Sequence, residues 1–367
     1  MIRPSEPRRI LIVRPSALGD VCRTVPVLAS LHRAWPEAQT DWVVQDESID
    51  AIAAHPALHE AIAFPRRQFA AWWRSPRVLA ELGRWLGEIR RRRYDLVLDC
   101  QGLGRSGLIT RYSGAPRRVG LRTSREMAWL AYTLRVPAPA SPHAVDRMLT
   151  LVKALAIEPL PDMRLHVPQS QRQWWAGRRA AAGLDDNSYA VLAPTARWQS
   201  KRWPGERFAA LAPALLQRGF ARIVLIGAPG EEDQVRELVA AGVAATGAVI
   251  DLVGRTSVGQ TMAIIEGAGL VVANDSAPLH MAVGLDRPCL GLYGPTEPDL
   301  VGPYGLPRSA LRRYVPQPGR RVYFKDASLG DSLMRLISVE DVLARIDELL
   351  GSHGARRPAS ASSERPS

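Results

Sequence analysis

The sequence lacks any long hydrophobic run. None of its apolar segments approaches the roughly 20 residues that a membrane-spanning helix needs. The first apolar run, Ile10-Leu11-Ile12-Val13, is too short for the core of a secretory signal and leads directly into Arg14-Pro15. We therefore expect a soluble globular protein without a transmembrane segment or a signal peptide.

Cysteine is also scarce. The three cysteines, Cys22, Cys100 and Cys289, lie far apart and form no Cys-x-x-Cys motif. This spacing argues against a structural zinc site and fits a reducing cytoplasm. The glycine fingerprint Gly-x-Gly-x-x-Gly of dinucleotide-binding domains is absent after the first apolar run.

Basic residues outnumber acidic residues, and the excess positive charge is unevenly distributed along the chain. The chain holds 48 Lys and Arg against 36 Asp and Glu, a formal net charge of +12. Nine arginines lie between Ala61 and Tyr94, where Glu81 and Glu88 are the acidic residues. Such a segment favours an anionic partner, either nucleic acid, anionic lipid or a phosphorylated substrate, and a solvated helix face is the simpler alternative.

Short apolar runs alternate with helical patterns along the chain. This alternation is typical of repeated βα units that build a parallel sheet. A chain of 367 residues is long enough for two such domains. We predict strands at residues 10–13, 41–44, 61–64, 96–100 and 118–121, and again at 189–193, 223–227, 250–254, 270–273 and 289–293.

The segment Pro159-Leu160-Pro161-Asp162 is the candidate linker, so we expect one α/β domain over residues 1–165 and another over residues 166–351. Leucines at helical spacing predict an amphipathic helix over residues 77–93, just after Trp72-Trp73. A last helix, beginning near Val342, is expected to stop at Gly351. Residues 352–367 are rich in Ser, Ala, Pro and Arg, which predicts a disordered tail.

The loop after the first predicted strand is one candidate site. It reads Arg14-Pro15-Ser16-Ala17-Leu18-Gly19-Asp20-Val21, and Gly19 permits an unusual backbone or a close approach by a ligand. Asp20 is either a general base in a cleft or simply an early helix residue that favours the helix dipole.

Loops of the second half supply further candidates. Lys201, in the loop after the strand at 189–193, can neutralise a leaving diphosphate or be a solvated cation. Glu231 can accept hydrogen bonds from a ribose or favour a helix start. The turn Asp275-Ser276 precedes a helix whose free N–H groups suit a phosphate, although such a pair is also an ordinary N-cap. Gly294-Pro295-Thr296 forms a tight turn of the same kind.

As a set, these segments resemble glycosyltransferase family 9, the heptosyltransferases of lipopolysaccharide assembly. The resemblance spans roughly residues 10–305 in the family's order, and the first half looks most like heptosyltransferase I. One departure stands out, because Ala277-Pro278 follows the turn where the family usually has glycine. The residues that carry the resemblance are Ser16–Asp20, Arg66-Arg67, Asp99–Leu103, Thr123–Glu126, Trp198–Pro204, Asp275 with His280, and Gly294–Thr296.

The resemblance implies a GT-B fold, in which two Rossmann-like domains hold the acceptor and the nucleotide sugar. It implies an inverting transfer, with heptose from ADP-heptose as the expected donor sugar and an anionic lipid-linked glycan as acceptor. No cofactor or metal is expected, since no Asp-x-Asp motif is present. Asp20 would be the base and Lys201 would stabilise the leaving diphosphate. Donor contacts would come from Thr195, Lys201, Glu231, Asp275, Ser276, His280, Gly294 and Thr296, and acceptor contacts from Ser16, Gly19, Arg66, Arg67, Gln101 and Arg125.

The resemblance also implies a cytoplasmic enzyme at the cytoplasmic face of the inner membrane. Three alternatives stay open. The first is the same chemistry with another nucleotide sugar or acceptor, and the second is a GT-B relative that epimerises a nucleotide sugar. The third is a basic nucleic-acid-binding protein, although the sequence shows no helix-turn-helix, zinc-finger or RNP pattern that would focus its charge.

Overall fold

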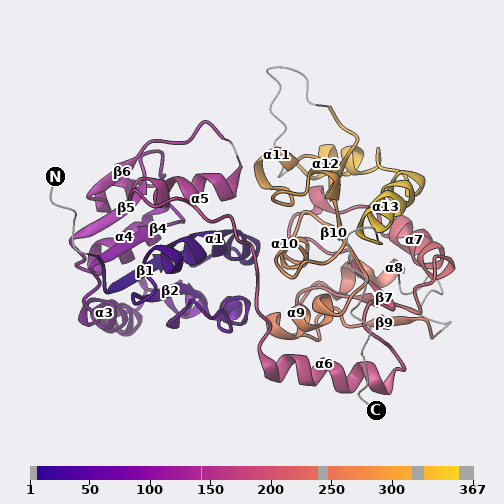
Figure 1. The fold of residues 1–367 in the computed structure, drawn as a ribbon, viewed down its shortest axis with the longest axis horizontal. Helices are drawn as coiled ribbons and strands as arrows, with labels where there is room; N and C mark the ends of the chain where they lie inside the picture. Colours follow the sequence, from indigo (N-terminus) through magenta and orange to yellow (C-terminus); the bar gives the residue numbers. More distant parts are fainter. Residues whose placement is uncertain (1–5, 142, 239–246, 316–325, 355–367) are drawn as a thin grey trace, which may run out of the picture. The chain divides into compact units, whose positions relative to one another are not determined.

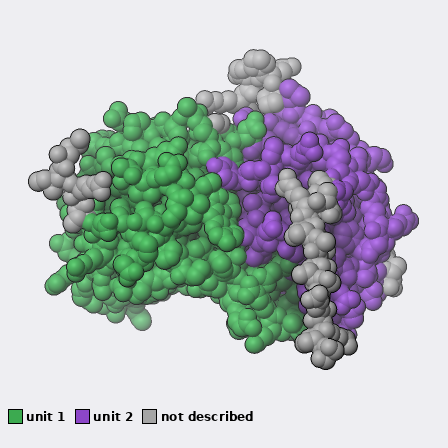
Figure 2. Space-filling view, viewed as in Figure 1, with its two compact units in different colours: residues 1–178, 257–266, 299–301 green, residues 179–256, 267–298, 302–367 purple. Residues whose placement is uncertain are grey.

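The computed structural model of the chain describes residues 6–141, 143–238, 247–315 and 326–354. The chain divides into two compact units (Figure 2). Unit 1 holds residues 1–178, 257–266 and 299–301, and unit 2 holds residues 179–256, 267–298 and 302–367. Each unit is described by itself below.

Unit 1 is built on a six-stranded parallel sheet with the order β3-β2-β1-β4-β5-β6 (Figure 1). Its central strand β1 is buried from Ile10 to Val13, because helices cover both faces, as parallel sheets require. The strands are β1 Arg9–Val13, β2 Gln39–Gln45, β3 Glu60–Phe64, β4 Leu96–Asp99, β5 Arg117–Leu121 and β6 Leu134–Val136. The α-helices that lie wholly in this unit are α1 Leu18–Ala34, α2 Arg66–Phe69, α3 Pro76–Arg91, α4 Gly104–Tyr112, α5 Ala144–Lys153 and α9 Val258–Glu266.

Unit 2 repeats the plan with the order β12-β11-β10-β7-β8-β9, again all parallel. Its central strands β7 and β10 are buried along their whole length. The strands are β7 Tyr189–Ala193, β8 Arg222–Leu225, β9 Val249–Asp251, β10 Leu270–Asn274, β11 Cys289–Tyr293 and β12 Ala310–Arg312. The α-helices are α7 Gly205–Gln217, α8 Arg236–Leu238, α10 Ala277–Gly284, α12 Ala327–Met334 and α13 Val339–Gly354, while α6 Gln169–Ala181 and α11 Pro298–Val301 straddle the division between the units.

Each sheet therefore has the doubly wound strand order, and in each the order reverses next to the first strand of its unit. In unit 1 the reversal lies between β1 and β4, and in unit 2 it lies between β7 and β10. Ligands of such sheets bind beyond the carboxyl ends of the strands at this point, because the loops on either side diverge and leave a crevice.

The structure corrects several sequence-based boundaries. The strands predicted at 223–227 and 250–254 end earlier, at Leu225 and Asp251. The stop predicted at Gly351 is wrong, because α13 continues to Gly354. The predicted tail thus begins too early, and its residues from 355 onward lie outside the described part of the chain. Among the helices that the structure describes, none is long and apolar enough to cross a membrane.

Candidate active site

A cavity of about 290 Å³ lies at the reversal point of unit 1. Loops from the ends of β1 and β4 form one wall, and the loop after β5 and the start of α5 form the other. Arginines outnumber aspartates in its lining, so the cavity suits an anionic ligand. The charged residues that line it are Arg14, Asp20, Arg23, Asp99, Arg125 and Arg147.

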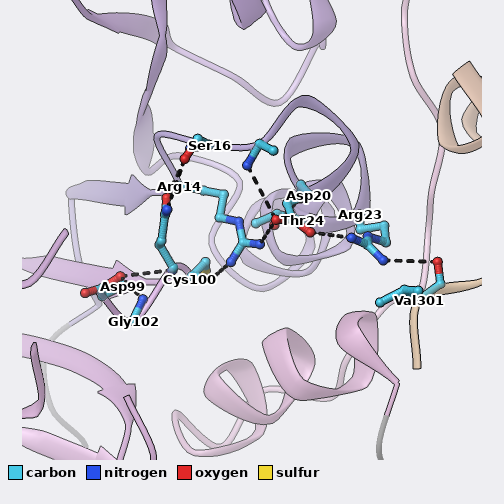
Figure 3. Close-up of polar contacts among 11 residues, drawn as sticks. Arg14, Ser16, Asp20, Arg23, Thr24, Asp99, Cys100, Gly102 and Val301 are labelled. Carbon is cyan, nitrogen blue, oxygen red and sulfur yellow. Dashed lines mark hydrogen bonds and ion pairs between the residues drawn. The ribbon is translucent and has the colours of Figure 1, made fainter. Parts of the chain in front are cut away.

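Asp20 lies in the first turn of α1, where its carboxylate accepts the N–H of Ala17 at 3.4 Å. Arg14 forms an ion pair with it at 2.6 Å, and Arg23, one helical turn further, also donates to it (Figure 3). Burial alone would raise the pKa of Asp20, but the charges of Arg14 and Arg23 outweigh burial and hold that pKa well below its usual range. Asp20 is therefore both the favourable helix-start residue and a charged group lining the cavity.

The sequence reasoning assigned no role to Asp99, which organises the loop after β4 in the same wall of this cavity. Its buried carboxylate accepts the N–H groups of Gln101 at 3.0 Å and Gly102 at 2.9 Å. It also accepts the hydroxyls of Ser106 at 2.9 Å and Tyr132 at 2.7 Å. Burial raises the pKa of Asp99, and these four donors oppose that rise. Asp99 thereby fixes the loop that presents Gln101.

Two glycines make this arrangement possible. A side chain on Gly102, whose φ is +70°, would meet the Ser124 hydroxyl at 2.6 Å. A side chain on Gly120 would meet the ring of Tyr132 at 2.3 Å. Tyr132 therefore reaches Asp99 only because β5 carries glycine at this position.

The predicted acceptor residues separate into two groups. Gln101 and Arg125 line the cavity, and Gln101 exchanges two hydrogen bonds with Ser16 at 3.0 and 3.1 Å. Gly19 lies in the first turn of α1 beside Asp20. By contrast, Arg66 lines a different cavity, and Arg67 forms an ion pair with Glu47 at 2.8 Å. The roles of all six in acceptor binding stay predictions.

Two cavity cations, Arg23 and Arg147, were missed by the sequence reasoning. Arg23 lies three residues after Asp20 in a helix, a spacing that places the two side chains on one face. This signal was present in the sequence. Arg147 gave no such signal, because α5 reaches the cavity only through tertiary packing.

At the reversal point of unit 2, Lys201 and Asp275 form an ion pair at 2.6 Å. Lys201 comes from the loop after β7, and Asp275 directly follows β10. Burial alone would raise the pKa of Asp275, but the charge of Lys201 and its hydrogen bond lower it. The Asp275 carboxylate therefore holds the lysine in place and is not itself free to meet a phosphate.

Asn274, to which no role was assigned from the sequence, ties the same two loops together. Its side chain donates to the carbonyl of Pro194 at 2.7 Å and accepts the N–H of Trp203 at 3.0 Å. The short helix that carries Lys201, Gln199–Lys201, also packs against α12, where a side chain on Gly330 would collide with Ser200. Lys201 is thus held from two directions.

Ser276 and α10 supply groups suited to an anion. The Ser276 side chain is the N-cap of α10 but makes no capping bond, and its buried hydroxyl has no partner among the described residues. The first N–H groups of a helix are also free and carry a partial positive charge. Pro278 lies at the second helical position, where its missing N–H costs no hydrogen bond.

The other predicted donor residues are held by contacts within unit 2. Thr195 is buried against Gly227, and His280 is buried within α10, where its charge would lower the pKa of Asp275. The Glu231 carboxylate accepts the N–H of Ala228 at 2.9 Å, so it stabilises its own turn. Gly294, in the turn with Thr296, faces Met334, whose sulfur lies 2.7 Å from where a side chain would begin. Their contacts with a donor stay predictions.

Among the described residues, one group of His and carboxylates is close enough to share a metal ion, namely Asp41, His59 and Glu60. It lies toward the amino ends of β2 and β3, whereas the cavity lies beyond the carboxyl ends of the strands. Arg92 forms ion pairs with Asp41 at 3.2 Å and Glu60 at 2.5 Å, and Tyr94 donates to Asp41 at 2.6 Å. These contacts give the two carboxylates a structural role.

Comparison with known proteins decides the family. The sequence model of Glycosyltransferase family 9 (heptosyltransferase) matches residues 82–319, more than half of the chain. The chain belongs to glycosyltransferase family 9. This glycosyltransferase is 31% identical over 310 residues to lipopolysaccharide heptosyltransferase 1 of Escherichia coli K12, covering 83% of the chain and 93% of the relative. It is 33% identical to the Pseudomonas aeruginosa protein of the same name, covering 81% of each.

Solved structures agree with this membership. Escherichia coli heptosyltransferase WaaC, with ADP-2-deoxy-2-fluoro heptose, aligns with a TM-score of 0.72 at 27% identity over 93% of this chain and 99% of that one. A family 9 glycosyltransferase from Veillonella parvula aligns with a TM-score of 0.74 over 94% and 97% of the two chains, and its 21% identity supports the fold alone. With its two six-stranded parallel sheets, this glycosyltransferase has the GT-B fold.

Proposed function

We propose that this glycosyltransferase moves heptose from ADP-heptose onto an anionic, lipid-linked acceptor of the lipopolysaccharide inner core, with inversion and without a metal ion. The single observation that carries the proposal is Asp20, an ionised carboxylate between Arg14 and Arg23 in a cavity lined by further arginines. The donor is suggested by the likeness to WaaC, which was solved with ADP and with a heptose analogue.

In the proposed reaction, the acceptor hydroxyl oxygen attacks the anomeric carbon of the donor. The new carbon–oxygen bond forms as the bond to the diphosphate breaks, and the hydroxyl proton passes to the Asp20 carboxylate. A carboxylate with a lowered pKa is a weak base. An anionic acceptor, however, competes for the guanidinium groups of Arg14 and Arg23, and this competition raises the pKa of Asp20 where the proton must go.

Unit 2 supplies the groups for the leaving ADP. Lys201, held by Asp275, offers a fixed positive charge, and the N-terminus of α10 offers free N–H groups and the Ser276 hydroxyl. Groups placed in advance of the reaction stabilise the charge that develops on the diphosphate without reorganising. These groups offset the charge that a divalent metal would otherwise neutralise.

A thermal-shift panel of ADP-, UDP-, GDP- and CDP-sugars tests the donor. A ligand at about 100 times its dissociation constant stabilises the folded protein by roughly 2.7 kcal/mol, so the true donor should stand out. Transfer from ADP-heptose to an inner-core acceptor should then persist in EDTA. Strict dependence on a divalent ion would contradict the lysine-based mechanism, and a preference for another nucleotide would contradict the donor.

A lipid-linked acceptor requires the enzyme to work at a membrane surface. We infer peripheral contact with the cytoplasmic face of the inner membrane. The arginine-rich segment between Ala61 and Tyr94 supports this inference, because anionic lipid headgroups attract clustered cations.

A further inference from the structure

A second cavity of unit 1, about 970 Å³ in volume, lies between α2, α3 and α4. Figure 1 shows α3 and α4 at one side of the first sheet, and the two helices are in contact. The buried side chains of Phe69, Leu86 and Ile109 form its floor. Aliphatic and aromatic groups of this kind offer no hydrogen bonds, so the floor suits an apolar ligand.

The rim of this groove exposes large apolar side chains. Trp72, Leu79, Leu108 and Tyr112 are each between 42% and 50% exposed, and Trp73 beside them is 63% exposed. Single exposed apolar residues are common, but these gather around one recess. Tryptophan and tyrosine at the edge of an apolar surface are typical of contact with the boundary between lipid and water.

Three arginines complete the lining, namely Arg66, Arg90 and Arg105. Within the described part of the chain, their guanidinium groups take part in no ion pair or hydrogen bond, and Arg105 lies 5.7 Å from the ring centroid of Phe64. Partial burial, and then the charge of Arg66, lower the pKa of Arg105, while the charge of Glu126 opposes this shift. Unpaired cations around an apolar recess fit a ligand with an apolar body and an anionic head.

Other occupants fit less well. A second copy of the chain, docked through the same face, would bring these three arginines against their own counterparts. Residues 355–367 hold three arginines, one glutamate and no large apolar side chain, so they match neither the floor nor the charge. A nucleic acid would find cations and aromatic faces, but no hydrogen-bonding groups on the floor for its bases.

We propose that this groove is a lipid-binding site, which takes a fatty-acyl chain of an anionic membrane phospholipid while Arg66, Arg90 and Arg105 meet its phosphate. The start of α4 links it to the active site, because Gly104 and Arg105 line the groove and Gln101 and Gly102 line the acceptor cavity. A lipid in the groove therefore holds the acceptor cavity close to the bilayer. The proposal rests on the proposed function only in that a lipid-linked acceptor is met at a membrane.

Vesicle binding without donor or acceptor tests the groove separately from the reaction. Vesicles of phosphatidylcholine alone are compared with vesicles that also contain phosphatidylglycerol, and bound protein is measured by sedimentation. Leu79→Gln with Leu108→Gln should weaken binding to the anionic vesicles about tenfold, because both side chains lose apolar contact with lipid. Leu336→Gln, which changes a leucine of similar exposure in unit 2, is the matched control and should bind like the wild type.

A second measurement distinguishes insertion from surface adsorption. Lipids with brominated acyl chains quench tryptophan only on close contact, so the fluorescence of the wild type should fall. The variant Trp72→Phe with Trp73→Phe should lose most of that quenching, although eight other tryptophans remain of the chain's 10. Arg90→Gln with Arg105→Gln should remove the preference for phosphatidylglycerol.

Several results would overturn the proposal. Equal vesicle binding by the wild type and the leucine variant would show that the arginines adsorb to the surface without use of the groove. If brominated chains did not quench the tryptophan fluorescence, the groove would not be taking up acyl chains. A dimer that the leucine variant abolishes would assign the groove to a second copy of the chain. ADP binding by the leucine variant should match the wild type in every case, so a failed lipid site is distinguishable from a failed transferase.

Discussion

Among single residues, Asp20 is the one to which the proposed mechanism gives two roles that make opposite demands. As a helix-start residue and partner of Arg14 and Arg23, it contributes to folding as an anion. As the proposed base, it would have to accept a proton, which those same arginines oppose. The acceptor resolves this conflict in the proposed mechanism, because its own negative charges take up the guanidinium groups.

Asp20→Asn should abolish most turnover and leave donor binding intact. The amide keeps the shape of the side chain but cannot accept the proton, and general-base catalysis contributes about 10²–10⁴-fold. Turnover with the inner-core acceptor and the thermal shift caused by ADP check the two halves of this expectation. A variant with near-normal turnover would show that the base lies elsewhere.

Asp20 should also make stability depend on pH. Because its pKa is lower in the folded protein than the unfolded value of about 3.9, its stabilising effect is complete above that value and declines as the pH falls below it. Wild type should therefore be more stable than Asp20→Asn at about pH 7, and the gap should shrink toward about pH 3. Denaturant unfolding at both pH values measures the gap. Asp233→Asn, which breaks an exposed pair with Arg236, should show almost no gap at either pH.

Lys201→Ala should lower turnover about 10²–10³-fold and weaken ADP binding less, because the diphosphate gains charge as it leaves. This change leaves Asp275 buried without its partner, so stability must be measured as well. The double variant Lys201→Met with Asp275→Asn removes both charges and should fold while still losing turnover. Lys153→Ala, at an exposed lysine of unit 1, is the matched control. Unchanged kinetics in the double variant would return Lys201 to a structural role.

The sequence allowed Asp20, Lys201 and Asp275 to be placed beyond the ends of strands, because each lies in the segment between an apolar run and the helical pattern that follows it. It did not reveal Asp99 or Asn274 as organisers, since their roles depend on loops that meet across neighbouring strands. It also did not show that Arg66 lies outside the cavity that Asp20 lines. That placement depends on how α2 packs, and a sequence motif carries no such information.

At the level of helices and strands, ten of the described strands coincide with apolar runs that predicted them from the sequence. The strands β6 Leu134–Val136 and β12 Ala310–Arg312 were missed because each is a three-residue edge strand that contains an arginine, so no apolar run marks it. So short an edge strand needs no continuous apolar pattern. The helix α13 passes through Gly351 because apolar contacts of its earlier turns, around Val342 and Ile346, outweigh the weak helix propensity of glycine.

The arginines at the end of α3 are expected to serve two different purposes, membrane attraction and stability. Arg90 and Arg91 are exposed, whereas Arg92 pairs with Glu60 and the buried Asp41. Arg90→Gln with Arg91→Gln should reduce binding to anionic vesicles, more so at low salt, and change stability by less than about 0.5 kcal/mol. Arg92→Gln should instead cost about 1.5–3 kcal/mol of stability, because it removes hydrogen bonds to charged groups. Vesicle sedimentation and thermal unfolding measure the two effects, and a reversed pattern would contradict this division of the arginine run.

For the whole molecule, the repeated strand order explains why there are two candidate sites. Each sheet reverses its order once beside its first strand, and each reversal holds an ion pair between a carboxylate and a cation. Unit 1 surrounds its carboxylate with arginines, as an anionic acceptor requires, and unit 2 pairs its carboxylate with a lysine beside a helix start, as a diphosphate requires. The division of charge therefore follows the division of substrates in the proposed function.

The net charge of +12 also allows a test against the nucleic-acid-binding alternative. A dense arginine run attracts any polyanion, so the enzyme should bind DNA and RNA weakly and without sequence preference. That binding should fall steeply as salt rises, since it comes from the release of counterions, whereas ADP-sugar binding in unit 2 should change far less. Titrations of fluorescent oligonucleotides and of ADP-heptose over a range of salt concentrations compare the two. Tight, sequence-selective nucleic-acid binding at physiological salt, together with no response to any nucleotide sugar, would refute the proposed donor and acceptor.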